Sequence, residues 1–296
     1  MGAGASALAA VLYGTSYVAT AIALRSFSPL GTAAARGLLG VLAIGLVLLL
    51  PAASGFRPRR MNAAAAWRLA ALALFGGPAF IAAMNYAVSL AGATVTAFVA
   101  GLYAVLAAAF AVPLLGERPE TRTVVALGLA LIGTGLLADL RLTGETAAGV
   151  GVGLVAAVLF ALFLVLSRRW SAAHGLPGPT VAFATLGLTA VSIGALLPVL
   201  GQGPFDGELR VDAVVAAAWL AVGPGALAAM LVVAGMRRIP ARRASAFLLL
   251  NPPTAALGAW WLLNESLTPL QLVGGALVLL AIAGAGGLAL ARPQAG

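Results

Sequence analysis

Few residues of this chain could do chemistry, because most of the sequence is apolar. Arg36, Asn85 and Asn251 each interrupt a long apolar stretch. An unpaired polar group costs several kcal/mol in a hydrocarbon environment, so polar residues at this depth should contact protein or a cavity. We therefore expect Asn251 to face protein or a cavity. We also expect the chemistry of the chain to be limited to the binding of a small molecule.

Aromatic side chains recur in the same stretches. Tyr13 and Tyr17 stand one helical turn apart, which places them on one face of a helix. One interpretation is ordinary packing with interfacial aromatic residues. The other is a pocket at the membrane midplane, in which rings surround a substrate and hydroxyls and amides orient it. The second interpretation predicts these substrate-binding residues: Tyr13, Tyr17, Met84, Asn85, Tyr103, Phe160, Phe163 and Asn251.

The charged residues within or beside apolar stretches each allow two interpretations. Arg36 could extend its side chain to the outer headgroups, or it could pair with Glu265 or Asp139. Glu117 and Glu265 precede the last apolar stretch of each half of the chain. A carboxylate there complements the positive end of a helix dipole. We expect this structural role rather than proton coupling, because both glutamates fall at membrane edges.

Two glycine-proline pairs lie early in long apolar stretches, at Gly77-Pro78 and Gly223-Pro224. Proline removes one helical hydrogen bond and glycine tolerates the resulting bend. Each pair is either a static kink or a hinge beside a cavity. Pro252, which is followed by another proline, interrupts a further stretch. We predict hinge residues at Gly77, Pro78, Gly223, Pro224 and Pro252.

The sequence around the first glycine-proline pair is repeated around the second. Met84 corresponds to Met230 and Glu117 corresponds to Glu265, and these residues are separated by nearly the same number of positions as the two glycine-proline pairs. The segment 9–13 (AAVLY) likewise resembles 156–160 (AAVLF). The chain is therefore a duplication, and we expect two domains, at residues 1–140 and 146–292.

Composition defines the class of protein. Apolar residues make up 62% of the 296 and charged residues 8%, far from the averages of soluble domains. Apolar windows of about 20 residues are typical of membrane spans. There is no cysteine and a single histidine, so we expect no metal centre and no cofactor. We predict an all-α integral membrane protein with ten transmembrane helices, at about 3–24, 30–51, 67–90, 93–115, 121–138, 147–168, 179–200, 212–236, 243–263 and 269–291.

The arginines predict the orientation of these spans. They concentrate in alternate connections, around residues 57–60, 118–122, 168–169 and 237–243. Positive connections face the cytoplasm, so both termini should be cytoplasmic. Each repeat has an odd number of spans, five, so the second repeat should be inverted relative to the first. Orientation in a membrane also explains the net charge of +9 better than binding to nucleic acid does.

These features resemble the drug/metabolite transporter superfamily, in its ten-span branch built from two EamA domains. The motifs that carry the resemblance are Asn85-Tyr86-Ala87 to Ala97, Glu117-Arg118-Pro119 with Gly128 and Gly133, and Asn264-Glu265-Ser266 with Gly274-Gly275. The resemblance implies a basket-like bundle that exports small metabolites, and exporters of aromatic and neutral amino acids are the nearest members. The first span differs: it reads Tyr13-Gly14-Thr15-Ser16-Tyr17, where many members have a tryptophan-led segment.

We predict a secondary transporter that exports small neutral or zwitterionic metabolites, above all amino acids, from a bacterial-type inner membrane. A single mid-span arginine does not suit a carrier of phosphorylated sugars, which needs several cationic groups. A carrier of organic cations would need a mid-span glutamate, and the sequence has none. Alternatives are export of hydrophobic drugs or other metabolites, and a non-enzymatic structural membrane protein. An intramembrane enzyme would need clustered Asp, His or Ser-Lys groups, so we expect no enzyme. The expected partners are a small-molecule substrate and the lipid bilayer, without nucleic acid, and a monomer is the working assumption.

Overall fold

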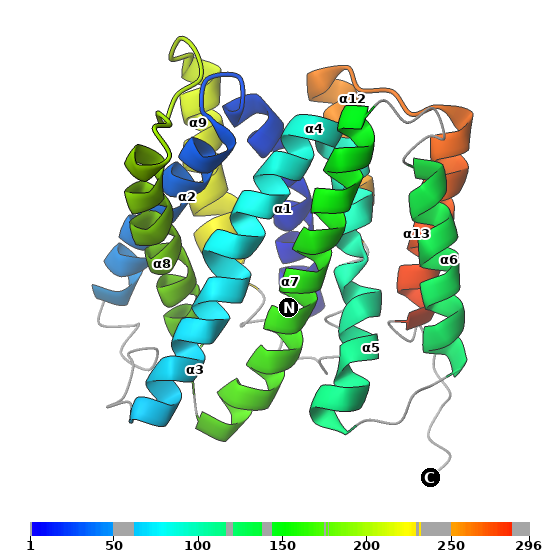
Figure 1. Ribbon diagram of the computed structural model, residues 1–296, viewed down its shortest axis with the longest axis horizontal. Helices are drawn as coiled ribbons and strands as arrows, with labels where there is room; N and C mark the ends of the chain where they lie inside the picture. Colours follow the sequence, from blue (N-terminus) through cyan, green and yellow to red (C-terminus); the bar gives the residue numbers. More distant parts are fainter. Residues whose placement is uncertain are drawn as a thin grey trace.

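The computed structural model is a bundle of helices (Figure 1). The structure describes residues 2–49, 62–116, 121–137, 144–174, 176, 178–228, 231 and 250–285. Regular secondary structure within these residues is helical, apart from one isolated β-bridge between Phe27 and Phe205. The helices are α1 (Gly2–Ala23), α2 (Pro29–Leu49), α3 (Ala63–Leu74), η2 (Phe75–Ala79), α4 (Phe80–Gly101), α5 (Tyr103–Leu115), α6 (Thr121–Leu137), α7 (Gly144–His174), α8 (Gly178–Val199), α9 (Val211–Leu220), η3 (Ala221–Leu227), α12 (Asn251–Leu263) and α13 (Pro269–Ala285).

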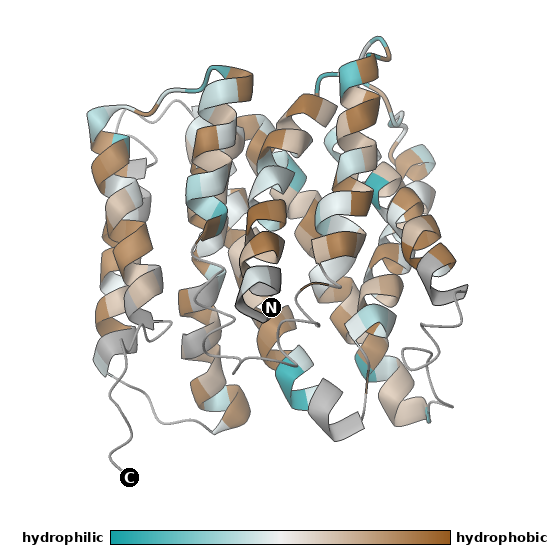
Figure 2. Ribbon diagram, turned by 180° about the vertical axis from the view of Figure 1, so that it is seen from behind, coloured by the Kyte–Doolittle hydropathy of each residue, from teal (hydrophilic) through white to brown (hydrophobic). Residues whose placement is uncertain are grey.

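The outer faces of the helices are apolar, as expected for a protein in lipid. Large apolar side chains point outward, among them Leu46 and Val191, which are 68% and 72% exposed. Figure 2 shows mostly apolar residues along the helices and hydrophilic residues in the connections at the upper end. Within the described residues, 4 helical stretches are long and apolar enough to cross a membrane: Pro29–Leu46, Ala63–Leu115, Gly144–Trp170 and Gly178–Val199. Shorter apolar helices cover Ala7–Ala23, Val124–Gly133, Val211–Leu227 and Pro269–Ala281.

The helices follow the apolar stretches of the sequence. The break predicted between the spans 67–90 and 93–115 is present, because Gly92 has φ 79° and ψ 170° and interrupts α4. This left-handed conformation suits glycine, and after it the chain descends toward α5 (Figure 1). One boundary differs. Helix α7 continues past its predicted end at 168 to His174, so this histidine ends a helix rather than lying in a loop. Arg168 and Arg169 are good helix formers and do not stop it.

Small residues bring the helices close together. Where α4 meets α7, a Cβ atom added to Gly149 would lie 2.8 Å from the backbone nitrogen of Ala91. Where α6 meets α13, a Cβ on Gly133 would lie 2.7 Å from the Gly274 carbonyl oxygen. Membrane helices associate through such small residues, because lipid supplies no hydrophobic drive between them. The bundle is therefore held by close backbone packing.

The upper end of the bundle in Figure 1 is tied by two connections, which we call the upper clasp: the α1–α2 turn (24–28) and the α8–α9 connection with the start of α9 (200–212). The Ser28 amide donates to the Pro204 carbonyl at 3.1 Å, and the Asp206 amide donates to the Ser26 carbonyl at 3.0 Å. A Cβ on Gly31 would lie 1.9 Å from the Pro204 carbonyl oxygen, so only glycine fits this approach.

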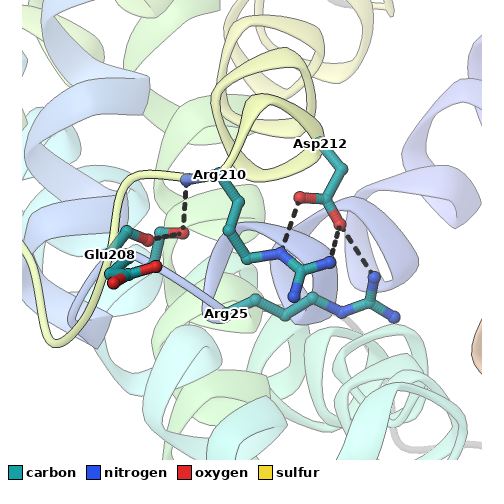
Figure 3. A network of polar contacts seen from close by, with 5 residues as sticks. Arg25, Glu208, Arg210 and Asp212 are labelled. Carbon is teal, nitrogen blue, oxygen red and sulfur yellow. Dashed lines mark hydrogen bonds and ion pairs between the residues drawn. The ribbon is translucent and has the colours of Figure 1, made fainter.

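Ion pairs add to the upper clasp (Figure 3). Arg25 and Arg210 both contact the Asp212 carboxylate, at 2.9 Å and 3.0 Å. The Ser26 hydroxyl donates to the Glu208 carbonyl at 2.7 Å and accepts from the Arg210 amide at 3.1 Å. The clasp thus joins the first and second halves of the chain at this end.

Candidate functional site

A cavity of about 320 Å³ lies between helices of both halves of the chain. This volume falls within the usual range for small-molecule sites, about 300–1,000 Å³. The described residues that line it are Tyr13, Ser16, Tyr17, Arg36, Gly76, Phe80, Ile81, Met84, Tyr103, Phe160, Phe163, Leu164, Ser167, Gly178, Val181, Ala182, Thr185, Leu186, Pro224, Gly225 and Asn251. Most of these side chains are apolar or aromatic, and none is acidic.

The predicted substrate-binding residues all line this cavity, with one exception. Asn85 is buried elsewhere, and its Nδ2 donates to the Pro29 carbonyl at 2.9 Å. Neighbouring residues on a helix point about 100° apart, so Met84 can face the cavity while Asn85 faces the start of α2. The Asn85 amide therefore joins α4 to α2. Substrate binding by the lining residues stays a prediction.

One side of the cavity is a group of aromatic rings. Phe160 lies at its centre, with ring centroids 4.6 Å from Phe80, 5.0 Å from Tyr103 and 5.5 Å from Phe163. Stacked and edge-to-face rings at these distances attract one another and form an apolar surface. Phe80 was not predicted from the sequence, although this residue lies just after the Gly77-Pro78 break. Its position beside a helix irregularity was the available signal.

The polar side of the cavity contains Arg36. Its side chain lines the cavity and only 7% of the residue is exposed. Its Nε and Nη1 atoms are buried without a hydrogen-bond partner among the described residues. The prediction that Arg36 extends its side chain to the outer headgroups is wrong, because a side chain this buried does not reach them. The predicted partner Glu265 binds backbone amides instead, and the alternative partner Asp139 lies outside the described residues.

Asn251 and Tyr103 meet across the cavity from opposite halves of the sequence. The Asn251 Nδ2 donates to the Tyr103 hydroxyl at 3.4 Å, and its Oδ1 is buried without a partner among the described residues. Asn251 begins α12, and Pro252 lies in the first turn. Proline is tolerated there because its missing N–H has no helical acceptor. In the described chain Pro252 thus starts a helix, and its hinge role stays a prediction.

Both glycine-proline pairs lie in π-helical turns, η2 and η3. Such turns accommodate proline because they displace the hydrogen bond that it cannot make. In η2 the backbone of Gly77 leaves helical geometry, with φ −106° and ψ −113°. In η3, Pro224 lines the cavity, whereas Pro78 is buried away from it. The sequence therefore placed the irregularities correctly, and their role as hinges stays a prediction.

Glu265 caps a helix, but a different one from that expected. Its two carboxylate oxygens accept hydrogen bonds from the backbone amides of Ala93 and Thr94, each at 3.0 Å. These amides start the part of α4 that follows Gly92, so the carboxylate complements the positive end of that segment and not of α13. This contact lies at the same end as the upper clasp and again joins the two halves. Glu117 lies outside the described residues.

The cavity extends away from the upper clasp. Ser167 lies near the end of α7 and Gly178 begins α8, and both line the cavity. The end of α7 and the start of α8 are at the lower end of the bundle in Figure 1. The α8 side of the cavity, including Val181 and Thr185, was not predicted from the sequence. The buried threonines of α8, Thr180, Thr185 and Thr189, were the available signal.

The fold and the apolar surface together define a helical membrane protein with a cavity among its helices. The chain belongs to the EamA-like transporter family, whose sequence model matches residues 1–138 and 147–286. It is 30% identical over 214 residues to an uncharacterized transporter of Archaeoglobus fulgidus, covering 71% of this chain and 73% of that protein. It is 28% identical over 193 residues to an uncharacterized transporter of Synechocystis, covering 61% of this chain and 55% of that protein.

A solved crystal structure has the same fold. It superposes with a TM-score of 0.65 at 22% sequence identity and covers 96% of both chains. At this level of identity the match shows the fold alone. Membership in the EamA-like transporter family identifies the protein as a membrane transporter. The residues that line the cavity are the basis for inferring its substrate.

Proposed function

We propose that this protein is a secondary transporter that exports small zwitterionic or neutral metabolites, most of all amino acids with apolar or aromatic side chains. The observation that carries the proposal is the cavity, which combines an aromatic surface with a few polar groups. An amphipathic metabolite matches both sides. A purely hydrophobic drug would match the rings around Phe160 and leave Arg36 without a partner.

Transport in this proposal proceeds by alternating access between two inverted halves, residues 1–140 and 146–292. The upper clasp and the Glu265 contact both join the halves at one end. The cavity runs toward the other end, where Ser167 and Gly178 lie. A carrier that closes one end while the other admits substrate needs this asymmetry. The arginine-rich connections support an orientation with this end and both termini in the cytoplasm of a bacterial-type cell.

Counterflow in proteoliposomes tests the proposal. Vesicles loaded with unlabelled phenylalanine should accumulate labelled phenylalanine, and protein-free vesicles should not. Phe160→Ala removes the central ring of the aromatic surface and should lower the rate about tenfold. Trp261→Ala is the matched control, because this aromatic side chain is exposed and outside the cavity. Absence of flux with every amino acid of a panel would contradict the proposal, and flux of apolar drugs alone would support the drug-export alternative.

A further inference from the structure

The position of Arg36 is energetically unfavourable when no ligand occupies the cavity. The residue is more than nine-tenths buried and lines the cavity, and its Nε and Nη1 atoms are buried without a hydrogen-bond partner among the described residues. Removing a charge from water costs free energy unless an opposite charge or several hydrogen bonds compensate. No described residue provides that compensation, since Glu265 binds the amides of Ala93 and Thr94.

We propose that Arg36 binds the carboxylate of the transported substrate, which is therefore a monocarboxylate with an apolar or aromatic body. This inference rests on the proposed function, because it assigns the cavity as the transport site. The guanidinium is a planar fork of N–H donors whose geometry matches the two oxygens of a carboxylate. Bound substrate then cancels the buried charge.

The rest of the cavity determines what the carboxylate is attached to. Arg36 is the only Lys, Arg or His among the described lining residues. A phosphate dianion would require further cationic groups, so the single guanidinium favours one negative charge. The aromatic surface around Phe160 accepts an apolar body.

An amino group on the substrate has a neutral acceptor and no ion pair. The described lining contains no Asp or Glu, whereas the buried Oδ1 of Asn251 is free to accept one hydrogen bond. Loss of the amino group should therefore weaken binding less than loss of the carboxylate does. The inference separates acids, including amino acids, from amines and amides of the same shape.

Thermal unfolding of the purified protein in detergent tests this with five probes that share a phenyl ring: phenylalanine, 3-phenylpropionate, phenylalaninamide, phenethylamine and phenyl phosphate. A ligand that binds only the folded state raises Tm. Phenylalanine and 3-phenylpropionate should raise Tm, and the other three should raise it far less. Equal effects of the amide or the amine would overturn the inference, and so would a stronger effect of phenyl phosphate or no effect of either acid.

Variants separate binding from a structural role. Arg36→Gln should weaken binding of both acids by about 30-fold, the lower range for loss of one partner of a buried charge pair. The same change should raise the Tm of the ligand-free protein, because it removes a buried charge that has no partner among the described residues. A structural arginine would give a lower Tm instead. Retention of the effect of the acids on Tm in Arg36→Gln would overturn the inference.

Two further variants complete the test. Arg36→Lys keeps the charge and loses the fork, so binding of the acids should be intermediate. Arg68→Gln is the control, because Arg68 is another arginine of a spanning helix, lies over Trp67 and does not line the cavity. It should leave the effect of the acids unchanged. Counterflow distinguishes the two proposals: carboxylate-dependent binding without flux contradicts transport alone, and flux of amide and acid at equal rates contradicts the Arg36 assignment alone.

Discussion

The two glycine-proline turns have the same local structure and very different surroundings. In η2, a Cβ on Gly77 would lie 2.6 Å from the Thr185 carbonyl oxygen, so this turn is pressed against the backbone of α8. In η3, the three atoms nearest to a Cβ on Gly223 belong to the ring of Trp219, at 2.9 Å and beyond. At Gly77 the first turn lies against backbone atoms, which cannot move aside easily. At Gly223 the second turn lies against a partly exposed side chain, although most of η3 is buried against α2 and α1.

This difference indicates where the protein can move. Pro224 and Gly225 line the cavity, so a change in η3 alters the site directly. Gly77 and Pro78 are buried, and Gly77 lies against the backbone of α8, so we expect η2 to hold the cavity in place. Matched sequence motifs therefore need not have matched roles, and we predict that η2 is a static kink and η3 a hinge.

The largest expected effect separates the two glycines. Gly77→Ala places a methyl group against a backbone carbonyl and should destabilise the protein by about 1–3 kcal/mol, as overpacking does. Gly223→Ala displaces only the Trp219 ring and should cost about 1 kcal/mol or less. Thermal unfolding of the two variants in one detergent measures this. Equal losses of Tm would remove the difference between the turns.

Pro224→Ala tests the hinge by its effect on transport. Alanine restores the N–H that proline lacks, so the turn can close into a regular helix. We expect counterflow to slow about tenfold, as for a residue that absorbs a conformational change. Pro78→Ala is the matched variant and should slow counterflow far less. Unchanged flux in Pro224→Ala, with normal expression and Tm, would contradict the hinge.

Gly76→Ala tests how η2 supports the cavity. A Cβ there would lie 2.6 Å from the Phe163 ring, which is a cavity wall. The ring must then move into the space of the substrate. We expect weaker binding of 3-phenylpropionate, about threefold to tenfold, with a small change in the Tm of the free protein. Unchanged affinity would show that Phe163 is not part of the binding surface.

The smallest expected effect concerns the side chain that borders η3. The Trp219 Nε1 donates to the Thr15 hydroxyl at 3.0 Å and so joins α9 to α1. Trp219→Phe removes this bond and should cost about 0.5–1.5 kcal/mol. The ring next to Gly223 is then less restrained, so counterflow should be unchanged or slightly faster. Thermal unfolding and counterflow together check this, and a marked loss of flux would assign Trp219 to the site.

The sequence was sufficient for the helices and for their irregularities. Long apolar stretches, the turn at Gly92 and the two proline breaks follow from local chemistry that a single sequence carries. The cavity residues Tyr13, Tyr103 and Asn251 could be anticipated as well, because polar and aromatic groups at depth need protein or water around them.

The sequence did not indicate which face of each helix points into the bundle. Helix α8 carries Thr180, Thr185 and Thr189 on its buried side, a weak polar signal among many apolar residues that did not identify Thr185 as a cavity residue. Asn85 was expected in the cavity, but it satisfies the Pro29 carbonyl instead. The partner of Glu265 lies far away in the sequence, at Ala93 and Thr94, and only the packed bundle brings them together.

The central claim is that two halves of one chain face opposite ways across a membrane. The chain contains no cysteine, so single cysteines can be introduced without background labelling. The most direct measurement labels Arg59→Cys, Arg242→Cys, Gln202→Cys and Ser266→Cys in intact cells with a thiol reagent that does not cross membranes. The account predicts labelling of positions 202 and 266 from outside and protection of 59 and 242. Labelling that separates 59 from 242 would contradict the inverted halves and the alternating access that depends on them.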